Sequence, residues 1–205
     1  IHWVVSEPQN VISSSGCELA QLVTTEGQTS RTCTVTFAGG SSSGTATPKI
    51  DKTPPAVSGA SAARGPDANG WYNHPGAFTF AGTDATSGVA ACSSPTYGGG
   101  DGASVGVSGV CTDNAGNTSV AALVTLQYDA TPPAVAASAA PAPTGAWHRK
   151  PVTVSFGGTD ATSGMAGCSA PVRYAGPDGD AATVKGSCTD NAGNGAEVSH
   201  TFKYD

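Results

Sequence analysis

The chain has 205 residues and few charges, with 9 Lys and Arg against 15 Asp and Glu, so its net charge is −6. This sparse, acidic balance argues against nucleic acid or an anionic lipid surface as a partner. No apolar run approaches the roughly 18 residues that a membrane helix needs, so we expect no membrane insertion. With 28 Gly and 14 Pro, the composition is typical of short strands joined by turns.

Strands are predicted along the whole chain, because apolar residues alternate with polar ones and no helical periodicity occurs. In chain order, the alternating segments are residues 1–3, 78–80, 124–128, 152–156 and 202–204. We expect Ile1 to lie inside a strand and Trp3 to lie in the core, because Trp3 occupies the place that Phe80 and Phe156 take later in the chain. Short strands with frequent turns predict an all-β sandwich of two antiparallel sheets.

The sequence repeats itself at a period of about 77 residues. TDATSG occurs at 83–88 and 159–164, CTDNAGN at 111–117 and 188–194, and a TPP linker ends at residues 55 and 133. A period of this length is enough for one small domain per repeat. We therefore predict modules at 1–53, 54–131 and 132–205, of which the first is incomplete and lacks its first strand.

The six Cys residues fall two to a repeat. A module of this size has a small core, and one disulfide is a common remedy. The predicted pairs are Cys17–Cys33, Cys92–Cys111 and Cys168–Cys188. Zinc is the rival interpretation, but no CxxC motif and no paired His accompany these residues. Disulfides would place the protein outside the cytosol, and we expect an extracellular or cell-surface location.

The run from GWYNHPGAFTFAGTDATSG (70–88) through CTDNAGN to YDATPP resembles the bacterial immunoglobulin-like repeats of secreted and surface-anchored proteins and adhesins. The resemblance covers residues 54–205 well and 1–53 in outline. It implies a seven-strand sandwich of Greek-key type, with strand B at 78–80, C at 90–92, F at 110–111 and G at 123–128. The disulfide would then join strands C and F, unlike the bridge between B and F of antibody domains.

Two sets of three Asp residues are expected to converge where a linker meets the next module. The loop after strand B, the loop after strand F and the incoming linker each carry one, and the sets are Asp51, Asp84 and Asp113, then Asp129, Asp160 and Asp190. In the first repeat, Glu7 stands at the position of Asp84. Calcium prefers several oxygen ligands of this kind, and giant adhesins similar to this chain use calcium at such junctions. Turn chemistry is the alternative, because Asp caps tight loops of this composition, and no cofactor is then required.

Other candidate sites are weaker. Trp71 and Trp147 could each stack on a sugar ring, or they could pack against the linker prolines. Residues 102–106 match GxSxG, but no helix is predicted to follow and the other complete repeat has no Ser there, so turn and strand is the better interpretation. The four His residues occupy unrelated positions and form no metal-binding spacing, so we predict that the protein is not an enzyme.

The sequence favours a structural spacer or stalk, a row of Ig-like modules in an extracellular bacterial surface protein or fibre. Because the first module lacks a strand, we expect it to be completed from outside residues 1–205. Residues that precede Ile1 could supply the strand, or another copy could pair beside residues 1–5 or 46–50 and build a filament. The alternative is an accessory module that binds polysaccharide through Trp71 or Trp147.

Overall fold

The computed structural model describes residues 1–6, 8–18 and 20–205, and the described chain is all-β. Its one helical element within these ranges is the 3-10 helix η1 (Pro8–Asn10). The strands of the first half are β1 (Ser13–Ser15), β2 (Gly27–Gln28), β3 (Arg31–Phe37), β4 (Gly40–Ala46), β5 (Lys49–Ile50), β6 (Ala56–Ala62), β7 (Trp71–Tyr72), β8 (Gly76–Thr83) and β9 (Val89–Cys92). Those of the second half are β10 (Thr96–Tyr97), β11 (Gly102–Gly109), β12 (Cys111–Asp113), β13 (Ala122–Tyr128), β14 (Ala134–Ala140), β15 (Val152–Thr159), β16 (Met165–Cys168), β17 (Val172–Tyr174), β18 (Gly179–Asp190) and β19 (Gly195–Tyr204).

The chain forms two compact units that do not coincide with the three predicted modules. Unit 1 comprises residues 1–59, 80–93 and 110–121, and unit 2 comprises residues 60–79, 94–109 and 122–205. Each TPP linker therefore lies in the same unit as the TDATSG and CTDNAGN segments that follow it in the sequence. Two of the three disulfides belong to unit 1 and one to unit 2. The division into three modules remains a prediction.

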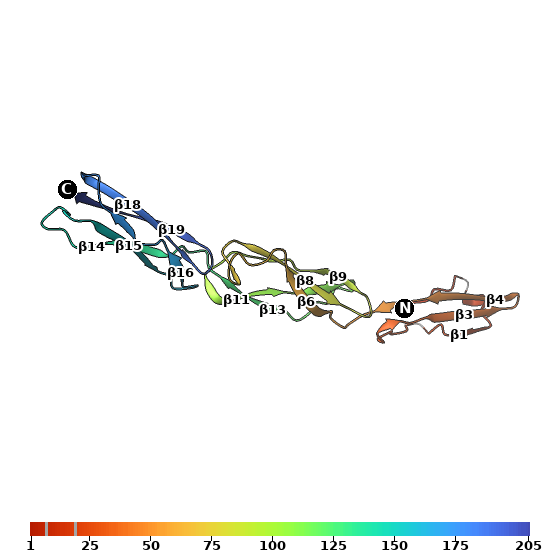
Figure 1. The fold of residues 1–205 in the computed structure, drawn as a ribbon. Helices are drawn as coiled ribbons and strands as arrows, with labels where there is room; N and C mark the ends of the chain where they lie inside the picture. The colour runs from red at the N-terminus through yellow and green to blue at the C-terminus, as the bar shows by residue number, and fades with distance from the viewer. Residues whose placement is uncertain (7, 19) are drawn as a thin grey trace. The chain divides into compact units, whose positions relative to one another are not determined.

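Unit 1 contains the antiparallel sheet β1-β3-β4 and the pairs β2-β5 and β9-β12. β3 and β4 run side by side in Figure 1. Alternation along β3 buries Cys33 and Val35 on one face. The opposite face carries hydroxyl groups, and Thr32 Oγ1 lies 2.9 Å from the Oγ1 of Thr45.

The expected strand at the N-terminus is wrong, because residues 1–5 have no strand conformation. Both edges of β3 are already paired, with β1 and β4, so this segment finds no edge there. Ile1 instead exchanges two backbone hydrogen bonds with Gln21, of 3.0 and 3.2 Å. Trp3 is half-buried rather than in the core, and its ring lies against Gly44.

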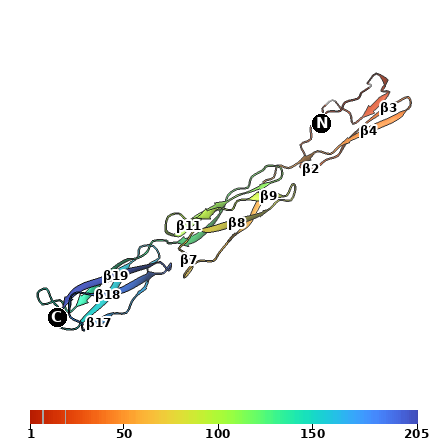
Figure 2. The same cartoon turned by 90° about the horizontal axis from the view of Figure 1, so that it is seen from above.

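Unit 2 contains the sheets β11-β13-β7, β14-β15-β17 and β16-β18-β19, together with residues of β10, β8 and β6. β18 and β19 form its longest antiparallel pair, drawn in blue in Figure 2. Residues of β15, β18 and β19 form a small hydrophobic core in unit 2, which consists of Val152, Val154, Ala182, Val184, Phe202 and Tyr204. Tyr174 packs edge-on against Phe202, with 5.3 Å between ring centroids. The predicted strands at 78–80, 124–128, 152–156 and 202–204 are confirmed.

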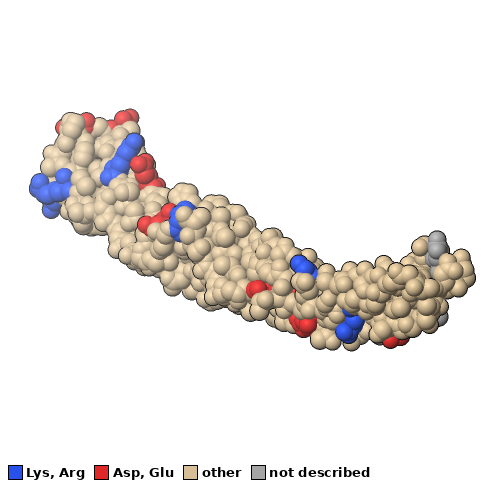
Figure 3. Space-filling model, turned by 90° about the vertical axis from the view of Figure 1, so that its right-hand side faces the viewer, with Lys and Arg blue, Asp and Glu red and all other residues tan. Residues whose placement is uncertain are grey.

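Three disulfides fit an oxidising environment outside the cytoplasm. Among the described residues, no helix has the length and apolar character that crossing a membrane requires. The face shown in Figure 3 is dominated by uncharged residues, in keeping with the low charge content of the sequence.

Candidate functional site

Each predicted set of three Asp residues is brought together in the structure. In unit 1, Asp51 follows β5, Asp84 follows β8 and Asp113 ends β12, and one carboxylate oxygen of each lies within 4.8 Å of the others. Asp113 is buried, whereas Asp51 and Asp84 are half-buried. Glu7, expected at the equivalent place in the first repeat, lies outside the described residues. We call this set the first carboxylate cluster.

Asp84 organises the loop that follows β8. Its Oδ1 accepts the backbone N–H groups of Thr86, Ser87 and Gly88 at 3.1, 2.9 and 2.9 Å. Gly88 has a φ of +79°, a left-handed conformation that a side chain would strain. The TDATSG motif is thus a loop closed by its own carboxylate, as the turn interpretation expected.

Asp113 does the same for the CTDNAGN motif. Its Oδ1 accepts the N–H groups of Ala115 and Asn117 at 2.9 and 2.8 Å, and its Oδ2 accepts Asn117 Nδ2 at 2.8 Å. Asn117 Nδ2 also donates to the backbone carbonyl of Asp51 at 3.2 Å. The final Asn of the motif therefore ties the loop to the linker, a role that its recurrence at 194 could have indicated from the sequence.

Asp51 joins the linker to the loop after β8. Its Oδ1 accepts the N–H of Thr53 at 3.0 Å, and its Oδ2 accepts the N–H of Ser87 at 3.0 Å. The Ser87 N–H is shared with Asp84, so one backbone donor lies between two carboxylates. The nearby Ser87 hydroxyl, followed by the backbone N–H groups, holds the pKa of Asp51 below its ordinary value.

The second carboxylate cluster, Asp129, Asp160 and Asp190, repeats these contacts in unit 2. Ser163 N–H again bridges two carboxylates, donating to Asp129 Oδ2 at 3.1 Å and to Asp160 Oδ1 at 2.9 Å. Asn194 Nδ2 donates to the backbone carbonyl of Asp129 at 2.9 Å. Asp129 and Asp190 are 0% and 2% exposed, so this cluster is more deeply buried than the first.

The pKa directions agree with hydrogen-bonded, ionised carboxylates. Burial opposes ionisation of Asp160, but the N–H donors of Gly164, Thr162 and Ser163 outweigh it and lower the pKa. Burial likewise opposes ionisation of Asp113, and the side-chain and backbone donors of Asn117 lower its pKa in spite of this.

The geometry bears directly on the calcium hypothesis. A cation held between the Asp51 and Asp84 oxygens that share the Ser87 N–H would face the positive end of that N–H. The same conflict arises at Ser163 in the second cluster. These oxygens thus fit a hydrogen-bonded cluster better than the ligand set of a hard cation. Calcium at the two clusters remains a prediction, tested by titration.

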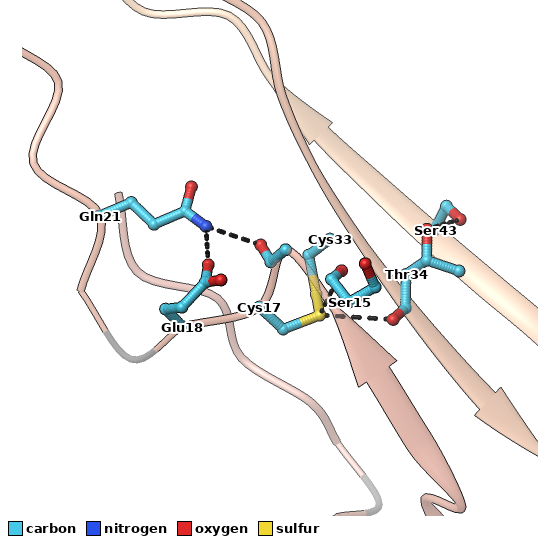
Figure 4. The surroundings of a disulfide bond; sticks show 8 residues. Ser15, Cys17, Glu18, Gln21, Cys33, Thr34 and Ser43 are labelled. Atoms are coloured by element: carbon cyan, nitrogen blue, oxygen red, sulfur yellow. Dashed lines mark hydrogen bonds between the residues drawn. A yellow bond between two sulfur atoms is a disulfide. The ribbon is translucent and has the colours of Figure 1, made fainter.

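The structure joins the same cysteine pairs that the sequence predicts: Cys17–Cys33, Cys92–Cys111 and Cys168–Cys188. Cys92 and Cys111 lie directly opposite each other in β9 and β12, and Cys168 and Cys188 do so in β16 and β18. The first pair differs, because Cys17 lies in a loop after β1 and not in a strand. Figure 4 shows this disulfide with Glu18 and Gln21 nearby, and the Gln21 side-chain amide donates to the Glu18 carboxylate.

The two candidate sugar-stacking residues differ in exposure. Trp71 is only 8% exposed and lies in β7, which leaves little of its ring for a ligand. Trp147 is half-buried, and Lys203 Nζ lies 5.4 Å from its ring centroid. The difference was not predictable from the sequence, in which the two residues hold equivalent positions.

The GxSxG segment lies within strand β11, and the structure places no helix after it. It therefore lacks the strand-to-helix turn of a nucleophile elbow. His148 is buried against Phe202 and takes part in strand pairing, which is a structural role.

A scan against protein-family models and a search of curated proteins found no match to this chain.

Proposed function

We propose that the chain is a structural spacer, a row of immunoglobulin-like sandwich modules in an extracellular bacterial surface protein or fibre. The observation that supports it is the duplicated carboxylate cluster, in which a linker Asp and the two following loops are tied by the same set of hydrogen bonds. Both clusters engage the segment that joins successive repeats.

The clusters limit the freedom of the linkers. Asp51 and Asp129 are each held through both their side chain and their backbone carbonyl. The Pro pairs that follow, 54–55 and 132–133, fix φ and remove backbone donors. A linker constrained in this way suits a protein whose task is to hold distance, and one disulfide per module would add resistance to unfolding.

The test is the stiffness of the linkers in solution. Spin labels on either side of each linker should report a narrow distance distribution in the native chain. Asn117→Ala and Asn194→Ala remove the amides that hold the linker carbonyls, so the distribution should broaden at the corresponding linker. Lys185→Ala, at an exposed position of β18, is the control. Distributions as broad in the native chain as in the variants would contradict the spacer proposal.

An accessory polysaccharide-binding role is the alternative, and one observation favours it. Trp147 lines an open cleft of about 470 Å³ together with Arg149, Asp178 and Tyr204. Aromatic and polar groups in one depression are the usual elements of a sugar site. A pull-down with insoluble polysaccharides, comparing the native chain with Trp147→Ala, separates this role from the spacer.

A further inference from the structure

A two-residue turn joins Ala68 to Trp71, the first residue of β7. Trp71 N–H donates to the Ala68 carbonyl at 2.7 Å, and Ala68 N–H donates to the Trp71 carbonyl at 3.3 Å. The central residues, Asn69 and Gly70, have φ values of +48° and +86°. Positive φ at both central positions is typical of a type I′ turn, for which Asn-Gly is a preferred sequence. Within the described chain, Asn69 is the one residue other than glycine that has a positive φ.

The Asn69 side chain joins this turn to a loop of the third repeat. Its Nδ2 donates to the backbone carbonyl of Asn191, in the second CTDNAGN segment, at 3.0 Å. The two loops pack closely, because a Cβ on Gly193 would lie 3.3 Å from the Cβ of Ala68. The same CTDNAGN segment holds the second linker through Asn194, so the turn contacts a loop that constrains the linker.

The third repeat shows that the backbone of the turn does not require Asn. Thr144 N–H donates to the Trp147 carbonyl at 3.1 Å, and Gly145 stands at the position of Asn69 with a φ of +68°. Glycine adopts this left-handed conformation without the steric cost that a side chain brings. What Asn69 adds to the turn is therefore its amide, which donates to Asn191.

Asn followed by Gly is also a chemically labile pair, and Asn is among the thermolabile residues. The Gly70 backbone N can attack the Asn69 side-chain carbonyl carbon, because glycine has no Cβ to hinder the approach. A bond forms between Gly70 N and Asn69 Cγ, and the Asn69 amide nitrogen leaves as ammonia with the proton of the Gly70 N–H. Water then opens the resulting succinimide ring at either of its carbonyl carbons and yields aspartate or isoaspartate.

The reacting groups at this turn are accessible. Asn69 and Gly70 are both exposed, and no described residue accepts a backbone hydrogen bond from the Gly70 N–H. The second Asn-Gly pair of the sequence, Asn194-Gly195, is held differently. Asn194 Nδ2 donates to the Asp129 carbonyl and to Asp190 Oδ2, both at 2.9 Å, and Gly195 is paired with Thr189 between β19 and β18. Reaction at Asn194 would first have to break these contacts.

We propose that Asn69-Gly70 is a self-modification site, at which deamidation releases the contact with Asn191 and loosens the second linker as the protein ages. The aspartate product has no N–H to donate to the Asn191 carbonyl, because an ionised carboxylate only accepts hydrogen bonds. The isoaspartate product also adds a methylene to the backbone of the turn. The effect on the linker deepens the proposed spacer function and rests on it, whereas the reaction itself does not.

The reaction is tested by incubating the 205-residue chain at neutral and at mildly alkaline pH. Peptide mapping by mass spectrometry should find the conversion of amide to acid at Asn69. In labelled water the product should take up oxygen-18, because the succinimide is opened by solvent. Asn194 should convert at least about 10-fold more slowly, since even one hydrogen bond to a charged acceptor slows local opening by that factor. Asn69→Gly, which copies Gly145, keeps the turn and removes the reactive amide.

The consequence is tested with spin labels on either side of the second linker. The distance distribution should broaden as the native chain ages, and Asn69→Asp should give a broad distribution from the start. Loss of one hydrogen bond should raise the loosened fraction about 3- to 10-fold. In Asn69→Gly the distribution should not change with time, and the first linker is the internal control.

Three results would overturn the proposal. The first is an intact Asn69 amide after a period in which a free peptide of residues 66–74, PDANGWYNH, converts fully. The second is conversion of Asn194 as fast as that of Asn69, and the third is a native-like distance distribution in Asn69→Asp. A distribution that is already broad in the fresh native chain contradicts the spacer proposal instead. The mass measurement still decides the reaction in that case, so the two failures are distinguishable.

Discussion

Replacing Asp160 distinguishes a cluster held by N–H donors from one that requires charge. Its Oδ1 accepts three backbone N–H groups at 2.9–3.1 Å. In Asp160→Ala, all three donors lose their acceptor. A hydrogen bond to a charged acceptor contributes about 1.5–3 kcal/mol. The three hydrogen bonds share a single acceptor oxygen, and in Asp160→Ala water can reach the donors of this half-buried loop. The loss of stability should therefore be much smaller than the sum of three such contributions.

The opposing effect is relief of repulsion. The carboxylate oxygens of Asp129, Asp160 and Asp190 lie within 4.8 Å of one another. Two charges at that separation repel by about 3.5 kcal/mol at an effective dielectric constant of 20, and solvent reduces this further. Asp160→Asn loses the charge but keeps an oxygen acceptor. We therefore expect Asp160→Asn to change the free energy of unfolding by less than about 1 kcal/mol, and Asp160→Ala to lower it by about 2 kcal/mol.

The assay is urea unfolding in chelator and again in millimolar calcium, with hydrogen exchange at Ser163 and Gly164 as the local readout. Exchange at both amides should accelerate in Asp160→Ala and stay close to native in Asp160→Asn. If Asp160→Asn is as damaging as Asp160→Ala, and the native chain is stabilised by calcium, the N–H explanation is refuted and a cation is required.

Three further outcomes are expected. The pKa values of Asp51, Asp113 and Asp160 are lowered in the folded state. The stability that their ionised forms give the fold is therefore fully present above about pH 4 and is lost as the pH falls further. Unfolding followed by circular dichroism from pH 7 to 2 checks this, and a stability maximum near pH 3 would contradict it. Val154→Ala, at a fully buried position, should cost about 2 kcal/mol in thermal unfolding, whereas Val172→Ala, its exposed partner in β17, should cost under about 0.5 kcal/mol. Gly82→Ala would place a Cβ 2.8 Å from the Cys111 sulfur, so the melting temperature should fall, and an unchanged value would show that the strands yield.

The sequence predicts best where repetition supplies a second instance. Cys92–Cys111 and Cys168–Cys188 hold equivalent positions in two repeats, and so do the Asp residues of the two clusters. Two Cys per repeat indicated which Cys residues pair, and the loop order implied by the Ig-like resemblance indicated which Asp residues converge. The hydrogen bonds within a cluster were not predictable to the same depth, because the bridging donor is the backbone N–H of Ser87 or Ser163, and every residue except proline carries one.

Predictions failed where the outcome depends on which strand edges are free. The alternation at residues 1–3 is typical of a strand, but both edges of β3 are occupied and the segment remains irregular. Trp71 lies in β7, which pairs in parallel with β13, some 55 residues later in the chain. No local pattern reveals such a pairing.

The two carboxylate clusters differ in burial although their motifs are the same. Asp129 follows β13, which pairs with both β7 and β11, and is fully buried. Asp51 follows β5, which pairs with β2 among the described residues, and is half-buried. The difference in burial thus follows the pairing of the strand before each linker Asp and not the Asp motif, which is the same in both repeats.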